Sequence, residues 1–173
     1  VLSGAGDPVR AAHAMASAER ELIRPAERLA LLFTPPFDRT AQDPGYIKAY
    51  PPGVRENGGQ YTHAGLWLVM AFAALGEGSR AGRLFAMLNP INHARTRSDV
   101  LRYKVEPYVV AADISAKQPH AGRSGWTWYT GSSGWIQRAG MESIIGLRLQ
   151  AGTLLFDPCI PAAWPGFEVT LRH

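Results

Sequence analysis

The pattern of hydrophobic positions predicts helices along most of the chain. Near the N-terminus, Asp7 followed by Pro8 has the form of an N-cap with proline in the first helical turn, and apolar residues recur at helical spacing to about Arg24. A short apolar run at 29–33 comes next. The irregular, proline-rich segment at 34–59 is long for a structureless stretch inside a compact domain, and such stretches are usually functional. This segment therefore marks the predicted ligand side of the fold.

Two helices in the middle of the chain are predicted to form a hairpin. Residues 61–75 are apolar almost without interruption, as expected of a helix that is buried nearly all round. A glycine-containing turn leads from it into a second helix over 79–88. Further along, we expect a short helix over 106–114, with a proline in its first turn, and a longer helix over 132–149.

A small β region is predicted at the C-terminus, in two strand-like runs at 153–156 and 167–171. The predicted fold is thus mainly α, with helical residues 1–150 and the start of a small β region at 151–173. The helices come as pairs joined by long loops on one side and short turns on the other, which is the connectivity of an α-toroid. Six pairs close such a ring and about two are present, so we expect the remaining helices to lie upstream.

Composition restricts the class of protein. The chain has 173 residues, of which 46% are hydrophobic and 18% charged, as is typical of a soluble globular domain with a proper core. The longest apolar run is about half of what a membrane-spanning helix needs, and no signal segment opens the chain. The one cysteine, Cys159, excludes an internal disulfide and is compatible with a reducing compartment.

The net charge of +4 comes from 15 arginines and three lysines. Many arginines can mean many fork-shaped contacts to phosphate or carboxylate groups, although codon usage in an arginine-rich genome explains them as well. The positive residues are scattered along the chain, and no run of five occurs. Binding to nucleic acid is therefore disfavoured.

The segment 50–63 collects residue types that hold a polar ligand. It contains Arg55, Glu56 and Asn57, then two adjacent glycines, and His63 at the start of the predicted buried helix. Free backbone N–H groups and the positive end of a helix attract anions, so an imidazole placed there can donate to phosphate. Glu56 can accept hydrogen bonds from sugar hydroxyls. The alternatives are a histidine that caps the helix and polar side chains that are merely solvated in a loop.

A second segment of the same character, 125–135, runs into the last predicted helix. Thr130 and Gly131 offer a hydroxyl and exposed amides at a helix start, although an ordinary cap has the same composition. No histidine or cysteine has metal-ligand spacing, and no Gly-x-Ser-x-Gly elbow is present, so we expect no metal site. Flat aromatic faces suited to stacking on pyranose rings, or else to core packing, are supplied by Tyr50, Tyr61, Tyr108, Trp126 and Trp128.

Four blocks of sequence stand out together. They are Arg55-Glu56-Asn57-Gly58-Gly59 through His63, Glu106-Pro107-Tyr108-Val109, Thr130-Gly131, and Asp157-Pro158-Cys159-Ile160-Pro161 through Trp164-Pro165-Gly166-Phe167. With these blocks in this order, the chain resembles the C-terminal part of glycoside hydrolase family 94, the inverting phosphorylases of β-glucosides, from about Leu29 to its end. Within the family it is similar to the C-terminal part of bacterial cyclic β-1,2-glucan synthases.

The resemblance implies the C-terminal portion of an (α/α)6 barrel with a short C-terminal β segment. It implies that His63, Thr130 and Gly131 bind inorganic phosphate, which is a co-substrate, and that no cofactor or metal is needed. Glu56 would contact the transferred glucosyl unit of a β-1,2-glucan oligosaccharide. The residues expected to bind this substrate are Arg55, Glu56, Asn57, Tyr108 and Trp126.

The implied reaction is direct attack of phosphate on the anomeric carbon with inversion. The family's general acid is an aspartate in an upstream Asp-Trp-Asn-Asp-like motif that this chain lacks, so no catalytic residue is expected here. The expected partner is the upstream part of the same polypeptide. Arg55 stands where cellobiose-type members carry lysine, and Ala112 where they carry glutamine, which argues against cellobiose as the substrate.

The resemblance also implies a cytoplasmic domain that is attached, in the intact protein, to the inner membrane. The helix faces left uncovered in a partial ring predict self-association of the chain. The alternative from another class is a non-catalytic carbohydrate-binding or interaction module that kept the pocket and lost the chemistry.

Overall fold

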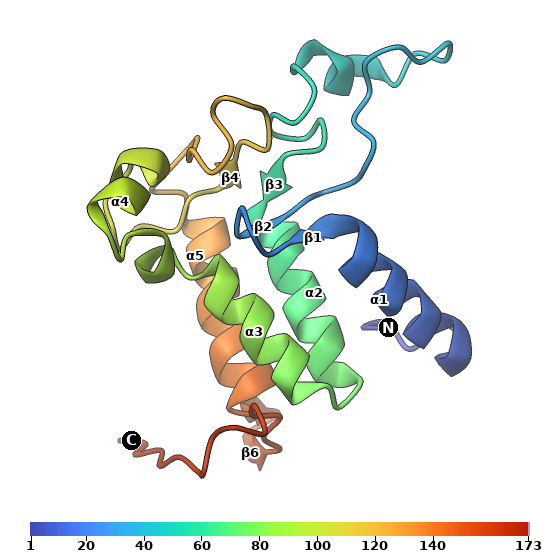
Figure 1. Cartoon of the computed structure of the whole chain (residues 1–173). Helices are drawn as coiled ribbons and strands as arrows, with labels where there is room; N and C mark the ends of the chain where they lie inside the picture. Colours follow the sequence, from blue (N-terminus) through green and yellow to red (C-terminus); the bar gives the residue numbers. More distant parts are fainter. Residues whose placement is uncertain (173) are drawn as a thin grey trace.

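The computed structural model describes residues 1–172, which fold into five α-helices and three two-stranded antiparallel ribbons (Figure 1). The helices are α1 (Pro8–Leu22), α2 (Thr62–Ala74), α3 (Gly78–Leu88), α4 (Arg97–Tyr103) and α5 (Thr130–Arg138). The ribbons pair β1 (Ile23–Arg24) with β2 (Leu29–Ala30), β3 (Gln60–Tyr61) with β4 (Asp113–Ile114), and β5 (Leu147–Gln150) with β6 (Thr153–Phe156). This mainly helical architecture with a few short strands agrees with the predicted fold class.

α1 begins where the sequence predicts. The Asp7 carboxylate accepts a hydrogen bond from the Arg10 N–H at 3.0 Å, and Pro8 occupies the first turn. The helix ends at Leu22, slightly before the predicted end, because the chain turns extended and pairs β1 with β2. The predicted hairpin is confirmed, since α2 and α3 follow one another through a short turn and pack together.

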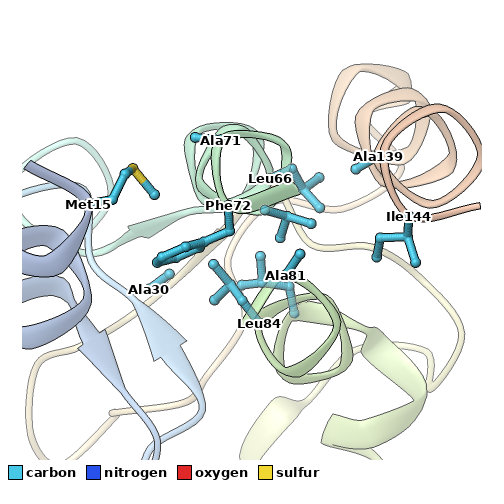
Figure 2. Close-up of a cluster of buried hydrophobic side chains, with 11 residues drawn as sticks. Met15, Ala30, Leu66, Ala71, Phe72, Ala81, Leu84, Ala139 and Ile144 are labelled. Carbon is cyan, nitrogen blue, oxygen red and sulfur yellow. The ribbon is translucent and has the colours of Figure 1, made fainter. Parts of the chain in front are cut away.

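The main hydrophobic core lies between α1, α2, α3 and residues 139–144, which follow α5. Figure 2 shows Phe72 reaching from α2 toward Ala30 of β2, with Leu84 of α3 beside it. α2 contributes side chains on several of its faces, which explains why its sequence is apolar almost throughout. The buried residues of this core are Met15, Ala30, Leu66, Val69, Ala71, Phe72, Ala81, Leu84, Leu88, Ala139 and Ile144.

The helix predicted over 106–114 is wrong. This stretch is a turn followed by extended chain, and the helix of this region is α4, which Thr96 caps by accepting from the Asp99 N–H at 3.1 Å. The backbone of the extended stretch is hydrogen-bonded by partners outside it instead of within a helix. The Thr62 N–H donates to the Ala112 carbonyl at 2.9 Å, and the Tyr103 hydroxyl donates to the Val109 carbonyl at 2.8 Å.

The helix predicted over 132–149 is correct only in its first part. α5 continues as a π-helical segment, Ala139–Ile144, and the chain then enters β5. The chain changes direction at Gly146, whose φ is 78°, and a Cβ atom on this residue would collide with the backbone of Asp157. The strand predicted at 153–156 is confirmed as β6, whereas residues 167–171 form no strand. The predicted boundary between residues 150 and 151 falls in the turn of the β5–β6 hairpin.

Among residues 1–172, none of the helices combines the length and the apolar character that crossing a membrane requires.

Candidate functional site

Two loop segments that are distant in sequence meet at one end of the helices (Figure 1). β3 pairs with β4, and beyond this ribbon the Ala116 N–H donates to the Gly53 carbonyl at 2.8 Å. The Ala112 N–H donates to the Trp126 carbonyl at 2.7 Å, which adds the segment after β4 to the same assembly. The loops at 34–61 and 115–129 therefore share one end of the fold.

Asn57 holds the first loop in shape. Its side chain is fully buried, its Oδ1 accepts from the Phe37 N–H, and its Nδ2 donates to the Phe37 and Tyr50 carbonyls, all at 2.8 Å. Gly58 follows with a φ of 81°, and a Cβ there would lie 2.9 Å from the Cβ of Pro36. The expectation that Asn57 binds substrate directly is therefore not supported by its position, because both amide hydrogens are already used.

Arg55 and Glu56 form a partly buried charged pair beside the loop. The Arg55 Nε lies 3.5 Å from the Glu56 Oε2, and within residues 1–172 neither atom makes a hydrogen bond although both are buried. The Arg55 guanidinium lies over the Trp126 ring at 4.4 Å and over the Tyr50 ring at 5.5 Å. Because buried polar atoms are normally hydrogen-bonded, these two atoms carry unused hydrogen-bonding capacity within residues 1–172.

Asp113 is a buried carboxylate that sequence reasoning did not select. Burial raises its pKa, the N–H of Trp126 lowers it by donating to Oδ1 at 3.0 Å, and Arg55 and Glu56 act on it with opposite signs. A Cβ on Gly125 would collide with this carboxylate, so glycine is required there. Asp113 thus accepts a hydrogen bond from the Trp126 backbone and interacts electrostatically with Arg55 and Glu56.

His63 lies in the first turn of α2, where the sequence predicts it. Its ring stacks on Trp135 of α5 with centroids 5.1 Å apart and meets Trp67 edge-on at 4.6 Å. In the described part of the chain its buried Nε2 has no hydrogen-bond partner. The imidazole is therefore oriented by two indoles and keeps one nitrogen free for a ligand.

The N-terminus of α5 begins at Thr130 and Gly131, which are both exposed. The residue before it, Tyr129, provides no side-chain cap, and the first N–H groups of a helix have no partners inside the helix. Ser132, which the sequence analysis did not select, is buried, and among residues 1–172 nothing hydrogen-bonds its Oγ. Since His63 packs on Trp135, the start of α2 lies against the middle of α5. That Thr130 and His63 meet one ion remains a prediction.

The aromatic residues of the second loop are mostly exposed instead of core. Trp126 stacks on Tyr129 with ring centroids 5.4 Å apart, and Tyr108 meets Trp128 edge-on at 6.5 Å. The Trp128 Nε1 donates to the Glu106 carboxylate at 3.1 Å. Tyr108 and Trp126, both predicted to bind substrate, are exposed at the same end as the Arg55–Glu56 pair. No three of the His, Cys, Asp or Glu side chains of residues 1–172 gather as metal ligands would.

Comparison with known proteins identifies one family. The family model described as "Glycosyl hydrolase 94 superfamily, catalytic domain" matches residues 1–146. The cyclic beta-(1,2)-glucan synthase NdvB of Rhizobium meliloti (strain 1021) is 56% identical over 171 residues, which cover 99% of this chain and 6% of that protein.

Several phosphorylases are also similar. The N,N'-diacetylchitobiose phosphorylase of Vibrio furnissii is 39% identical over 98% of this chain and 21% of its own length. The solabiose phosphorylase of Paenibacillus borealis is 28% identical over 95% of this chain and 21% of its own length. The chain therefore spans about a fifth or less of the relatives named here.

Proposed function

The chain belongs to the glycosyl hydrolase 94 superfamily, and on this premise we propose that it carries the phosphate-binding and glucosyl-binding loops of a β-1,2-glucan synthase or phosphorylase domain. The domain would transfer glucosyl units of β-glucans by inverting phosphorolysis, with inorganic phosphate as co-substrate and no further cofactor. The similarity to a β-1,2-glucan synthase at 56% identity supports this substrate class.

One observation carries the proposal. Three buried polar atoms at the loop end of the fold, on Arg55, Glu56 and His63, make no hydrogen bond within residues 1–172. Leaving a buried donor or acceptor without a partner costs about 1–3 kcal/mol each, so such a group persists where a ligand or ordered water completes it. A sugar hydroxyl suits the carboxylate, and a phosphate oxygen suits the imidazole.

The roles follow from the chemistry of each group. His63, Thr130 and the Gly131 amide hold phosphate at the start of two helices, where N–H groups and the helix dipole favour an anion. Glu56 accepts from the hydroxyls of the transferred glucosyl unit, and Arg55 donates to the substrate from its position over Trp126. Trp126 and Tyr108 offer rings to the glucan chain, and Asn57 keeps the loop in place.

The remaining parts of the reaction would come from outside this chain. Phosphate attacks the anomeric carbon, the glycosidic bond breaks, and a carboxylic acid upstream in the same polypeptide protonates the leaving oxygen. On this proposal, α2, α3 and α5 belong to a larger (α/α)6 ring whose other helices are upstream. Attachment of the whole enzyme to the inner membrane belongs to the same proposal.

The test is kinetic and uses the intact enzyme. His63→Ala should raise the KM for phosphate about tenfold and leave the KM for the glucan within about twofold, because the imidazole contacts only the nucleophile. Glu56→Gln should lower kcat about 100-fold with the fold intact, as expected when an interaction with the transition state is lost. His13→Ala on exposed α1 is the control and should change neither constant. Equal losses for both substrates in His63→Ala would assign it a structural role.

The alternative is a carbohydrate-binding module without chemistry, and the exposed aromatic residues of the second loop favour it. Assay of the intact protein for glucose 1-phosphate decides between the two. Binding of β-1,2-glucan without any phosphate-dependent release of glucose 1-phosphate would support the module and contradict the enzyme.

A further inference from the structure

Trp128 is held in an unusual backbone conformation at the surface. Its φ is 60°, in the left-handed region that bulky residues rarely adopt, and yet 66% of the residue is exposed. Strained backbone tends to occur at ligand sites, where the surrounding structure enforces it. The indole is not buried among residues 1–172, so packing of the ring does not account for this conformation.

Two neighbours fix the orientation of this indole. Its Nε1 donates to Glu106 at 3.1 Å, and the Tyr108 ring meets it edge-on at 76°. The polar edge of the indole is thereby occupied, and its faces remain available. Tyr108 is itself 66% exposed, so within residues 1–172 the faces of both rings are open.

The chemistry around the ring selects the ligand. Hydrogen bonds from its own backbone N–H and from Trp128 lower the pKa of Glu106, so its carboxylate is charged at neutral pH and can accept further hydrogen bonds. A carboxylate repels phosphate groups and accepts from hydroxyls. An aromatic face beside a hydroxyl acceptor therefore matches a neutral pyranose.

We propose that Trp128, Tyr108 and Glu106 form a second sugar-binding site that holds a further glucosyl unit of the same β-glucan chain. The proposal rests on the proposed function for the class of glucan. Tyr108, which packs against Trp128, contacts the glucan at this second site, and Arg55 and Trp126 contact it at the first. Because Trp126 and Trp128 are two residues apart on one loop, a long glucan can occupy both sites, whereas a disaccharide fills only one.

The test compares the affinities of the intact protein for a β-1,2-linked disaccharide and for linear β-1,2-glucan of about ten units, measured by calorimetry. In the wild type the longer glucan should bind more tightly. Trp128→Ala should weaken binding of the long glucan about 3- to 10-fold, the usual size of one aromatic contact, and leave the disaccharide unchanged. Glu106→Gln, which keeps the shape and removes the charge, should show a smaller loss with the same selectivity.

Matched controls separate this site from the rest of the protein. Trp164→Ala removes another exposed indole, in the C-terminal segment, and should leave both affinities unchanged. Unchanged affinity for the long glucan in Trp128→Ala, with a native unfolding temperature, would overturn the second site. An equal loss for both sugars would also overturn it, because Trp128 would then belong to the first site. A wild type that binds neither sugar would instead refute the proposed function itself.

Discussion

Replacing Asn57 with alanine should destabilise the protein strongly although Asn57 lies in a loop. The substitution removes three hydrogen bonds, to the Phe37 N–H, the Phe37 carbonyl and the Tyr50 carbonyl, from a side chain that is fully buried. Each such bond contributes about 1 kcal/mol net, so the loss is about 3 kcal/mol, and the unfilled space adds to it.

Asn89→Ala is the matched control. Asn89 also hydrogen-bonds backbone, but it accepts one bond, from the Ile91 N–H at 3.0 Å at a solvent-exposed helix start. Losing this cap should lower the free energy of unfolding by about 1 kcal/mol. Asn57→Asp should be at least as damaging as Asn57→Ala, because an oxygen then faces two carbonyls that the amide now bonds.

Urea unfolding followed by circular dichroism measures these differences directly. If Asn57→Ala lowers the free energy of unfolding no more than Asn89→Ala does, the buried amide does not stabilise the loop and the reasoning fails. In the intact enzyme, Asn57→Ala should also weaken substrate binding, because the loop carries Arg55 and Glu56.

Three other outcomes are expected. Gly125→Ala should lower the free energy of unfolding by about 2–3 kcal/mol, because the added Cβ would collide with Asp113. Gly131→Ala is the control: its Cβ would enter open space, so the free energy of unfolding should change by less than about 0.5 kcal/mol. Equal effects of the two substitutions would contradict the steric argument. Folding raises the pKa of Asp113, so the stability linked to its proton is present below the unfolded value and is lost as pH rises through the folded value. Asp113→Asn should therefore gain stability relative to the wild type as pH increases from about 4 to 7 in unfolding measurements, and a pH-independent difference would refute this. The 173-residue chain by itself should release no glucose 1-phosphate from β-1,2-glucan oligosaccharides and phosphate, because the proposed general acid lies upstream, and detectable release would overturn that assignment.

Local signals in the sequence were sufficient to predict the helical hairpin. The apolar run of α2, the glycine turn after it and the Asn89-Pro90 stop of α3 act within a few residues, so their effect is legible without the fold. The types and order of Arg55, Glu56 and His63 likewise indicated a polar ligand before any geometry was known.

Distant contacts decided the rest, because a local pattern does not encode the partner of a backbone group. The stretch before β4 is extended because Ala112 accepts from the Thr62 N–H and donates to the Trp126 carbonyl, and because β4 pairs with β3; these partners are far away in sequence. The helix that begins at Thr130 gives way to β5 because β6 returns to pair with it. Distant contacts also separate the roles of the candidate residues. Tertiary packing turned Asn57 inward to hold the first loop, and it left buried polar atoms of Arg55, Glu56 and His63 without hydrogen-bond partners in residues 1–172.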